Sequence, residues 1–190
     1  LQHRKTIAIS GTHGKTTTTA LTAWVLDALG HCPGYLLGGI PVNMPSSARL
    51  GQAPYFVIEA DEYDTACFDK RPKFFHYPAH ALIINNLEFD HADIYSDLDA
   101  IKRQIKHYLA TLKPGTYVVY PAQCPHISEL VQNAPWLSAT ATHAHQASGP
   151  WRLEPLQADW SQFTIYDSKQ NPHHVTWPLI CKHNAENALN

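Results

Sequence analysis

The sequence predicts an α/β fold: a mostly parallel sheet with flanking helices, joined to a small antiparallel sheet near the C-terminus. Two observations predict it. Through most of the chain, short apolar segments typical of buried strands alternate with longer segments of helical periodicity. After about residue 147, strand-like segments follow one another with turns between them. Strands separated by helices favour parallel pairing beneath helices on both faces, whereas strands joined by turns favour antiparallel pairing.

In the first part of the chain, four strands and two helices are expected. The helices are recognised by apolar residues at three- and four-residue steps, and Asp97 is a candidate N-cap for the second. The expected strands are Lys5–Ser10, Tyr55–Ala60, Ala81–Asn85 and Thr116–Tyr120, and the expected helices are Lys15–Leu29 and Asp97–Leu112.

The first helical segment has an amphipathic pattern. Its apolar residues fall on one side, which is the periodicity of a helix. These residues are Leu21, Trp24, Val25, Ala28 and Leu29.

The last part of the chain predicts the small antiparallel sheet, within residues 147–180. Strands are expected at 151–154, 162–166 and 174–177, with turn residues at 167–172 between the last two. A further helix is expected from His183 onward.

Composition excludes some functional classes. The chain has 190 residues, of which 44% are hydrophobic and 16% charged, with a formal net charge of -2. This balance argues against a basic nucleic-acid-binding protein. No segment contains the roughly 18 consecutive apolar residues of a membrane span. The four cysteines form no CxxC pair, which favours reduced thiols and a cytoplasmic protein.

A glycine-containing segment between the first strand and the first helix is the strongest candidate site. It reads SGTHGKTTTT from Ser10 to Thr19. Backbone N–H groups at a helix N-terminus converge on an anion, Lys15 can reach phosphate oxygens, and the Thr16 hydroxyl can bind Mg²⁺. The strict G-x-x-x-x-G-K-[ST] pattern is not met, because Ile9 stands five residues before Gly14. The alternative is a glycine turn followed by a chance lysine.

Acidic residues follow the second expected strand. The segment Glu59 to Asp64 reads EADEYD. Ligands of open α/β sheets bind beyond the carboxyl ends of the strands, so Glu59 is expected to face the phosphate loop and bind Mg²⁺. The alternative is a solvated acidic loop.

The third expected strand ends in NNLEFDH, from Asn85 to His91. A neutral imidazole flanked by carboxylates suits a second divalent ion. A structural role for His91 is an equally weighted alternative.

These three strand ends resemble the central ATP-binding domain of the Mur ligase family. GTHGKTTTT resembles the family's phosphate loop, and EADEYD and NNLEFDH resemble its metal-binding strand ends. The closing HNAEN, from His183 to Asn187, resembles its nucleotide-contacting H-N-x-x-N. One departure is Cys181, at a position where the family usually has glycine.

The finer resemblance is to the peptidoglycan-recycling branch. It is carried by EADEYDTACFDKRPKF (59–74) and NNLEFDHADIY (85–95). The resemblance implies an ATP-dependent acid–amino-acid ligase. Its reaction joins the tripeptide L-Ala-γ-D-Glu-meso-diaminopimelate to UDP-N-acetylmuramate through an acyl phosphate. ATP and Mg²⁺ are the implied cofactors.

The resemblance also implies residue roles. Lys15, Glu59 and His91 would be catalytic; Thr16, Glu59 and His91 would bind metal; Tyr63, Lys70 and Arg71 would lie near the substrate. Lys106 has about the spacing of a carbamylated lysine in several relatives, and no role is assigned to it. The residues implied in ATP binding are Gly11, Thr12, His13, Gly14, Lys15, Thr16, Thr17, Asn184 and Asn187.

Because the phosphate loop starts so early in the chain, residues 1–190 are expected to be the central domain of a three-domain enzyme. Neither the UDP-sugar domain nor the C-terminal domain fits in this length, and the fragment alone is expected to be inactive in ligation. Three alternatives stay open: a UDP-N-acetylmuramate–L-alanine or folylpolyglutamate-type ligase, a P-loop kinase or nucleotide switch, and a non-catalytic nucleotide-binding module.

Overall fold

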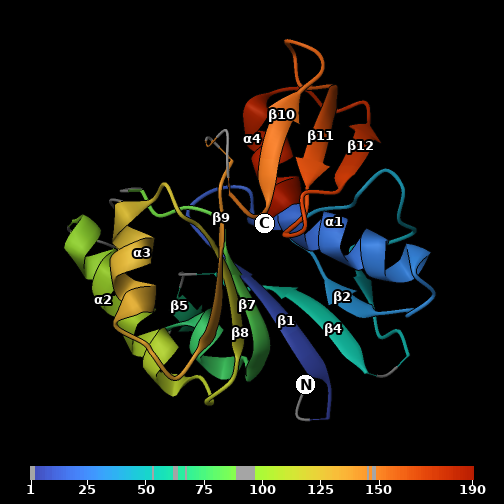
Figure 1. The fold of residues 1–190 in the computed structure, drawn as a ribbon. Coiled ribbons are helices and arrows are strands. Elements are labelled where there is room, and N and C mark those ends of the chain that lie inside the picture. Colours follow the sequence, from blue (N-terminus) through green and yellow to red (C-terminus); the bar gives the residue numbers. More distant parts are fainter. Residues whose placement is uncertain are drawn as a thin grey trace.

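The computed structural model describes residues 3–52, 54–61, 64–66, 68–88, 97–144, 146 and 149–190. Its centre is a seven-stranded sheet in the order β3-β2-β4-β1-β7-β8-β9 (Figure 1). All neighbours in this sheet pair in parallel except β2 and β3. The strands are β1 (Lys5–Ser10), β2 (Gly34–Leu36), β3 (Ala48–Arg49), β4 (Tyr55–Glu59), β7 (Ala79–Ile84), β8 (Tyr117–Pro121) and β9 (Ser138–Thr142).

Helices cover both faces of this sheet. Helix α1 (Lys15–Ala28) lies on one face, while α2 (Leu98–Thr111) and α3 (Pro125–Gln132) lie on the other (Figure 1). The two faces follow from the strand alternation: Ala8 packs in the core beside α2 and α3, and Ile9 packs in the core beside α1. The predicted fold class is therefore confirmed.

Helix α2 begins at the predicted N-cap, Asp97. An Asp97 side-chain oxygen accepts a hydrogen bond from the Ala100 N–H at 2.7 Å, which satisfies one of the N–H groups that a helix start leaves without a partner. In the described part of the chain, no helix combines the length and apolar character needed to span a bilayer.

The apolar side of α1 is not the side that packs against the sheet. The helix buries Thr18, Thr19 and Ala23, while Trp24, Val25 and Leu29 are 49%, 46% and 67% exposed. The phosphate loop fixes how α1 leaves β1, so the loop decides which side of the helix meets the sheet.

The small antiparallel sheet is formed by β10 (Arg152–Pro155), β11 (Gln162–Tyr166) and β12 (Pro172–Thr176). It packs with α4 (Lys182–Leu189) around a separate core that includes Phe163, Ala185 and Leu189. Helix α4 also contacts α1, which places it at the carboxyl edge of the main sheet (Figure 1). The three expected strands and the last helix are thus present.

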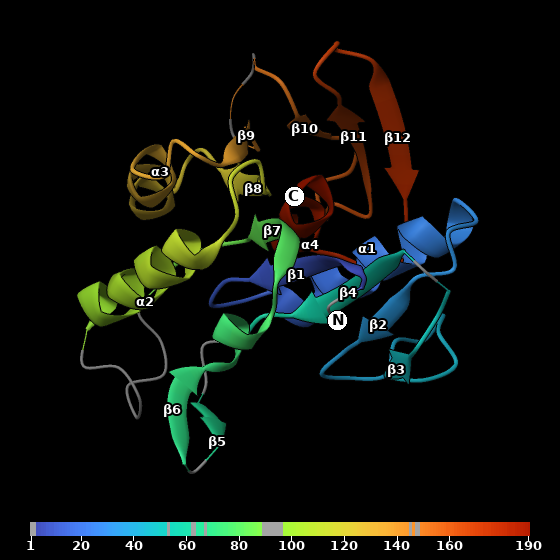
Figure 2. The same cartoon turned by 90° about the horizontal axis from the view of Figure 1, so that it is seen from below.

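Several elements were not predicted from the sequence. Two of them form a hairpin, β5 (Asp64–Ala66) with β6 (Asp69–Pro72), and the hairpin leads into the 3-10 helix η1 (Lys73–His76). Figure 2 shows this hairpin projecting from the body of the molecule. Strands β2, β3 and β9 and helix α3 complete the list of unpredicted elements.

Candidate functional site

The phosphate loop occupies the point where the strand order of the main sheet reverses. β1 lies between β4 and β7, and the loop leads from the end of β1 into α1. Ligands of open α/β sheets bind at such a point. Gly11 and Gly14 have φ values of 133° and 78°, a region that residues with a Cβ rarely adopt. The two glycines therefore allow the turn that aims the N-terminus of α1 at a bound anion.

The loop is held by the residues that follow β7. The His13 N–H donates to Asn86 Oδ1 at 2.8 Å, and Asn86 Nδ2 donates to the His13 carbonyl at 3.1 Å. The Thr12 hydroxyl accepts from the Glu88 N–H at 3.0 Å and donates to the Glu88 carbonyl at 3.1 Å. These two pairs fix the loop conformation from the segment after β7, 73 and 76 residues away in sequence.

Asn85 adds a buried contact to the same region. Its Nδ2 donates to Thr18 Oγ1 at 2.8 Å, and a Cβ on Gly11 would stand 3.2 Å from the Asn85 Cβ. This strand end was predicted to bind metal, and its role in supporting the loop was not predicted. The signal that was available is the pair of asparagines directly after an apolar strand.

Lys15 lies along the loop. Its Nζ donates to the Gly11 carbonyl at 2.7 Å and to the Thr12 carbonyl at 3.3 Å, and stands 3.9 Å from Asp61 Oδ1. Its side chain is 11% exposed. The ammonium group is thus held beside the N-terminus of α1, where the sequence analysis expected a phosphate-binding lysine.

Glu59 and Thr16 meet at the carboxyl edge of the sheet, as predicted. The Thr16 hydroxyl donates to Glu59 Oε2 at 3.1 Å, and the Gly38 N–H donates to Glu59 Oε1 at 2.5 Å. A carboxylate and a hydroxyl are hard oxygen ligands of the kind that Mg²⁺ prefers. Gly38 is a second residue that the sequence analysis missed, although a Gly-Gly pair after a short apolar segment marks a turn.

Helix α4 packs against the phosphate loop. Asn187 packs against Gly14 so closely that a Cβ on that glycine would stand 2.5 Å from Asn187 Oδ1. The Asn184 side chain makes a different contact: its Nδ2 donates to the Ile180 carbonyl at 2.7 Å. A cavity of about 500 Å³ opens beside Asn187 and His13, so the predicted asparagine and the loop border the same space.

Comparison with known proteins identifies the family. The family model of the Mur ligase middle domain matches residues 9–190. The chain belongs to the Mur ligase family. The predicted family is therefore confirmed.

Relatives of two kinds match the chain. The UDP-N-acetylmuramate–L-alanyl-γ-D-glutamyl-meso-2,6-diaminoheptandioate ligase of Haemophilus influenzae is 43% identical over 189 residues, covering 100% of this chain and 41% of its own length. The UDP-N-acetylmuramate–L-alanine ligase of Carboxydothermus hydrogenoformans is 37% identical over 190 residues, covering 99% of this chain and 39% of its own length. This Mur ligase chain thus spans about two fifths of the length of these relatives.

The fold is also shared with a solved structure. The crystal structure of the UDP-N-acetylmuramate:L-alanyl-γ-D-glutamyl-meso-diaminopimelate ligase from Neisseria meningitides superposes with a TM-score of 0.88 at 39% identity. The match covers 100% of this chain and 60% of that one. The Mur ligase fold therefore extends over the whole chain.

The remaining predicted residues of this Mur ligase chain are not all brought to the loop. Arg71 pairs with Asp69 on the hairpin through two bonds of 2.9 Å. These hydrogen bonds hold the pKa of Asp69 well below its usual value and raise the pKa of Arg71. His91 and Tyr63 lie outside the described residues, as does the side chain of Lys70. Within the described ranges, no group of three or more His, Cys, Asp or Glu side chains is arranged to hold a metal ion.

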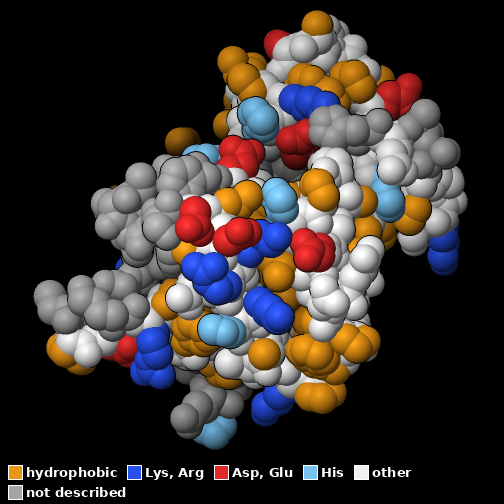
Figure 3. Space-filling model, turned by 90° about the vertical axis from the view of Figure 1, so that its left-hand side faces the viewer, with side chains coloured by type: hydrophobic (Ala, Val, Ile, Leu, Met, Phe, Trp, Pro, Cys, Tyr) orange, Lys and Arg blue, Asp and Glu red, His pale blue; other side chains and the backbone are white. Residues whose placement is uncertain are grey.

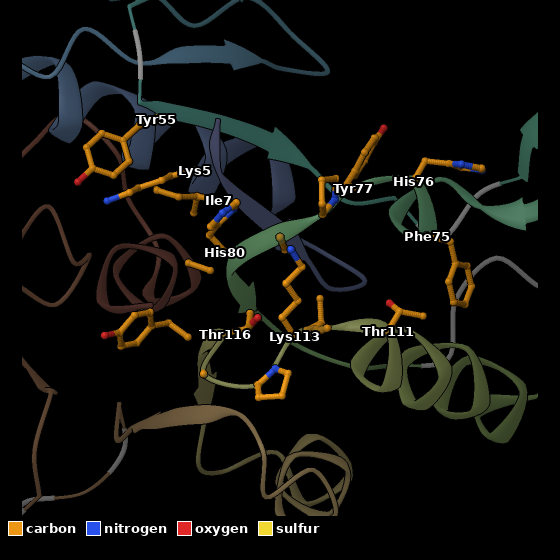
Figure 4. Close-up of a pocket in the computed structure, with 17 residues that line it drawn as sticks. Lys5, Ile7, Tyr55, Phe75, His76, Tyr77, His80, Thr111, Lys113 and Thr116 are labelled. Atoms are coloured by element: carbon orange, nitrogen blue, oxygen red, sulfur yellow. The ribbon is translucent and has the colours of Figure 1, made fainter. Parts of the chain in front are cut away.

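A second cavity of about 680 Å³ lies at the opposite, amino-terminal edge of the sheet (Figure 4). Lys5, His80 and Lys113 line it together with aromatic rings. The Thr6 N–H donates to His80 Nδ1 at 3.3 Å, which places the proton of the neutral ring on Nε2. Among the predicted site residues that the structure describes, none lines this cavity.

The outer face of α2 and α3 carries charges of both signs close together (Figure 3). Lys102 lies 3.2 Å from Glu129 on α3 and 3.9 Å from Asp99 on its own helix. This Mur ligase face therefore has no single sign of charge with which to attract a polyanion.

Proposed function

We propose that this chain is the ATP- and Mg²⁺-binding part of a ligase that joins L-Ala-γ-D-Glu-meso-diaminopimelate to UDP-N-acetylmuramate in peptidoglycan recycling. The observation that carries the proposal is the 43% identity, over the whole chain, to the H. influenzae ligase whose name states these substrates. The paired Thr16 and Glu59 at the phosphate loop support the nucleotide-binding part of the proposal.

The residues present fit a nucleotide. The first turn of α1 offers backbone N–H groups, because Gly14 has no side chain to cap them. Lys15 is held beside them, so its ammonium group can exchange its hydrogen bonds to the loop carbonyls for hydrogen bonds to phosphate oxygens. The residues proposed to hold ATP are Gly11, Thr12, His13, Gly14, Lys15, Thr16, Thr17, Asn184 and Asn187. Asn184 would have to exchange its hydrogen bond to the Ile180 carbonyl for one to the nucleotide.

The residues present also fit Mg²⁺. Thr16 and Glu59 would hold it with oxygen ligands, and the Gly38 N–H keeps the second Glu59 oxygen in place. His91, which lies outside the described residues, is proposed as a ligand of a second ion.

When bound, Mg²⁺–ATP supplies the γ-phosphoryl group: an oxygen of the muramoyl carboxylate takes it to form an acyl phosphate, and ADP leaves. The tripeptide amine then attacks the acyl carbon, so that an amide forms and phosphate leaves. The task of this chain is to hold the phosphates in line and to offset their negative charge. Lys15 and the N-terminus of α1 perform that task at the loop.

Replacement of the loop lysine tests the nucleotide site. In the full-length protein, Lys15→Ala is expected to lower ATP-dependent phosphate release by at least about a hundredfold, because one cation is lost from the phosphoryl group. The change should leave the thermal midpoint within a few degrees. Lys169→Ala, in the turn before β12, is the control and should retain full turnover. Turnover by Lys15→Ala at the wild-type rate would contradict the phosphate-loop assignment.

An acceptor panel separates the tripeptide ligase from its alternatives. Full-length protein with ATP, Mg²⁺ and UDP-N-acetylmuramate is given the tripeptide, L-alanine or no acceptor, and phosphate release is measured. We expect release with the tripeptide. Release with L-alanine alone would identify an L-alanine ligase, which the 37% identical relative keeps as the second candidate. Release without any acceptor would favour a nucleotide switch, and no release at all would favour a non-catalytic binding module or a kinase whose own acceptor is absent.

A further inference from the structure

The carboxylate of Asp61 lies between two lysines. Asp61 Oδ1 is 3.9 Å from Lys15 Nζ, and Asp61 Oδ2 is 3.9 Å from Lys73 Nζ. The side chains of Lys15, Asp61 and Lys73 are 11%, 25% and 42% exposed. Each carboxylate oxygen thus faces its own ammonium group in a partly desolvated place, where charges interact more strongly than in water.

The three residues come from different elements. Asp61 follows β4 two residues after Glu59, Lys15 begins α1, and Lys73 begins η1. Lys73 is presented by an anchored turn, because the next residue, Phe74, is fully buried and stacks on Tyr108 at a centroid distance of 4.7 Å. The unpredicted hairpin and η1 therefore deliver a second lysine to the edge of the phosphate site.

A bound nucleotide would change the balance of positive and negative charge around Asp61. Phosphate oxygens form stronger charge-assisted hydrogen bonds than the loop carbonyls that Lys15 contacts in this structure. Movement of Lys15 toward the phosphates would leave the Asp61 carboxylate close to the negative charge of the nucleotide. Lys73 contacts the other carboxylate oxygen, so it can stay in place when Lys15 moves.

We propose that Lys73 is a positioning residue that compensates the charge of Asp61 when Lys15 is drawn to the terminal phosphates. The inference rests on the proposed ATP site. It assigns to Lys73 a role that acts through Asp61 and requires no contact with the substrate. It also gives the hairpin and η1 a function at the nucleotide site.

The test measures nucleotide affinity in a double-mutant cycle on the full-length protein. Binding of a fluorescent non-hydrolysable ATP analogue and of fluorescent ADP is titrated for wild type, Lys73→Met, Asp61→Asn and the double variant. Lys73→Met is expected to weaken binding of the ATP analogue about fivefold, the scale of a partly exposed ion pair, and to weaken ADP binding less. The double variant is expected to bind the analogue within about twofold of Asp61→Asn, because an asparagine needs no compensating charge.

Two further variants control for the fold and for charge in general. Lys73→Arg keeps the charge and should retain wild-type affinity. Lys102→Met removes a lysine that also faces two carboxylates, but on α2 and away from the loop, and it should not change affinity. Thermal midpoints of all variants show whether each is folded.

The possible outcomes are distinct. Equal affinities of wild type and Lys73→Met, or a Lys73→Met defect that persists at full size in the Asp61→Asn background, would overturn the role of Lys73 alone. A wild-type protein that binds neither nucleotide would overturn the proposed function, and this inference with it.

Discussion

Cys181 has a backbone conformation that suits glycine. Its φ and ψ are 76° and 141°, and it occupies the N-cap position of α4, the helix that carries Asn184 and Asn187. The Cys181 N–H donates to the Asp159 carbonyl at 2.9 Å, and the Cys181 carbonyl accepts from the Asn184 N–H at 3.2 Å. These bonds hold the residue in a strained region. The cysteine thus keeps the turn that the family usually makes with glycine.

Relief of this strain is a testable prediction. Cys181→Gly is expected to raise the free energy of unfolding by about 1 kcal/mol, since glycine adopts this φ without steric cost and the gain exceeds the added entropy of the unfolded chain. Chemical denaturation measures the change. Cys181→Ser keeps the Cβ and serves as the control, with no gain expected. A Cys181→Gly protein no more stable than the serine variant would contradict the prediction.

At the scale of elements, the segment after β2 positions the end of β4. The Gly38 N–H holds Glu59, and a Cβ on Gly38 would stand 3.1 Å and 3.3 Å from the two Glu59 carboxylate oxygens. A Cβ on the neighbouring Gly39 would meet only Thr16 Cγ2, at an ordinary 3.8 Å. Gly39→Ala is therefore a matched control for Gly38→Ala, since the same change at the neighbouring position meets no close contact.

Gly38→Ala is expected to displace the Glu59 carboxylate and weaken the Mg²⁺-dependent part of nucleotide binding about tenfold, while Gly39→Ala has little effect. The measurement is the affinity of the full-length protein for an ATP analogue with Mg²⁺ and with EDTA. Equal effects of the two substitutions, or a loss that is the same without metal, would argue against a role for Gly38 in positioning Glu59.

At the scale of the whole molecule, the small sheet has a core of its own. Phe163 is fully buried there, with Trp177 at a ring-centroid distance of 5.0 Å and Leu189 of α4 in the same cluster. The main sheet is stabilised by two other clusters, one on each face. The small sheet and α4 are therefore expected to open as a unit without unfolding of the main sheet.

Phe163→Ala tests this expectation. The cavity is expected to cost about 3–5 kcal/mol, so amide hydrogen exchange in β10–β12 and α4 should become at least a hundredfold faster while β1 and β7 keep their protection. Phe163→Leu provides a milder variant if the alanine protein does not fold. Equal acceleration in β1 and in β11 would show that the molecule unfolds as one unit.

Prediction from the sequence succeeded where the pattern is local. The strand–loop–helix order around Lys15 and the Asp97 cap depend on neighbouring residues, so each could be recognised within a short window. Sequence position also sufficed to bring Thr16 and Glu59 together, because carboxyl ends of adjacent parallel strands share one edge. Strands β2 and β3 and the hairpin strands are too short to show a periodic pattern, and they were missed.

The sequence alone determined the family, the fold class, the phosphate loop and the acid that faces it, since each depends on a motif or on strand order. The tertiary structure decided the rest: the side of α1 that is buried, the support of the loop by Asn85 and Asn86, the hold of Gly38 on Glu59, and the meeting of Lys15 and Lys73 at Asp61. These contacts join residues from 12 to 73 positions apart. No local pattern encodes them, because they depend on how separate elements pack against one another.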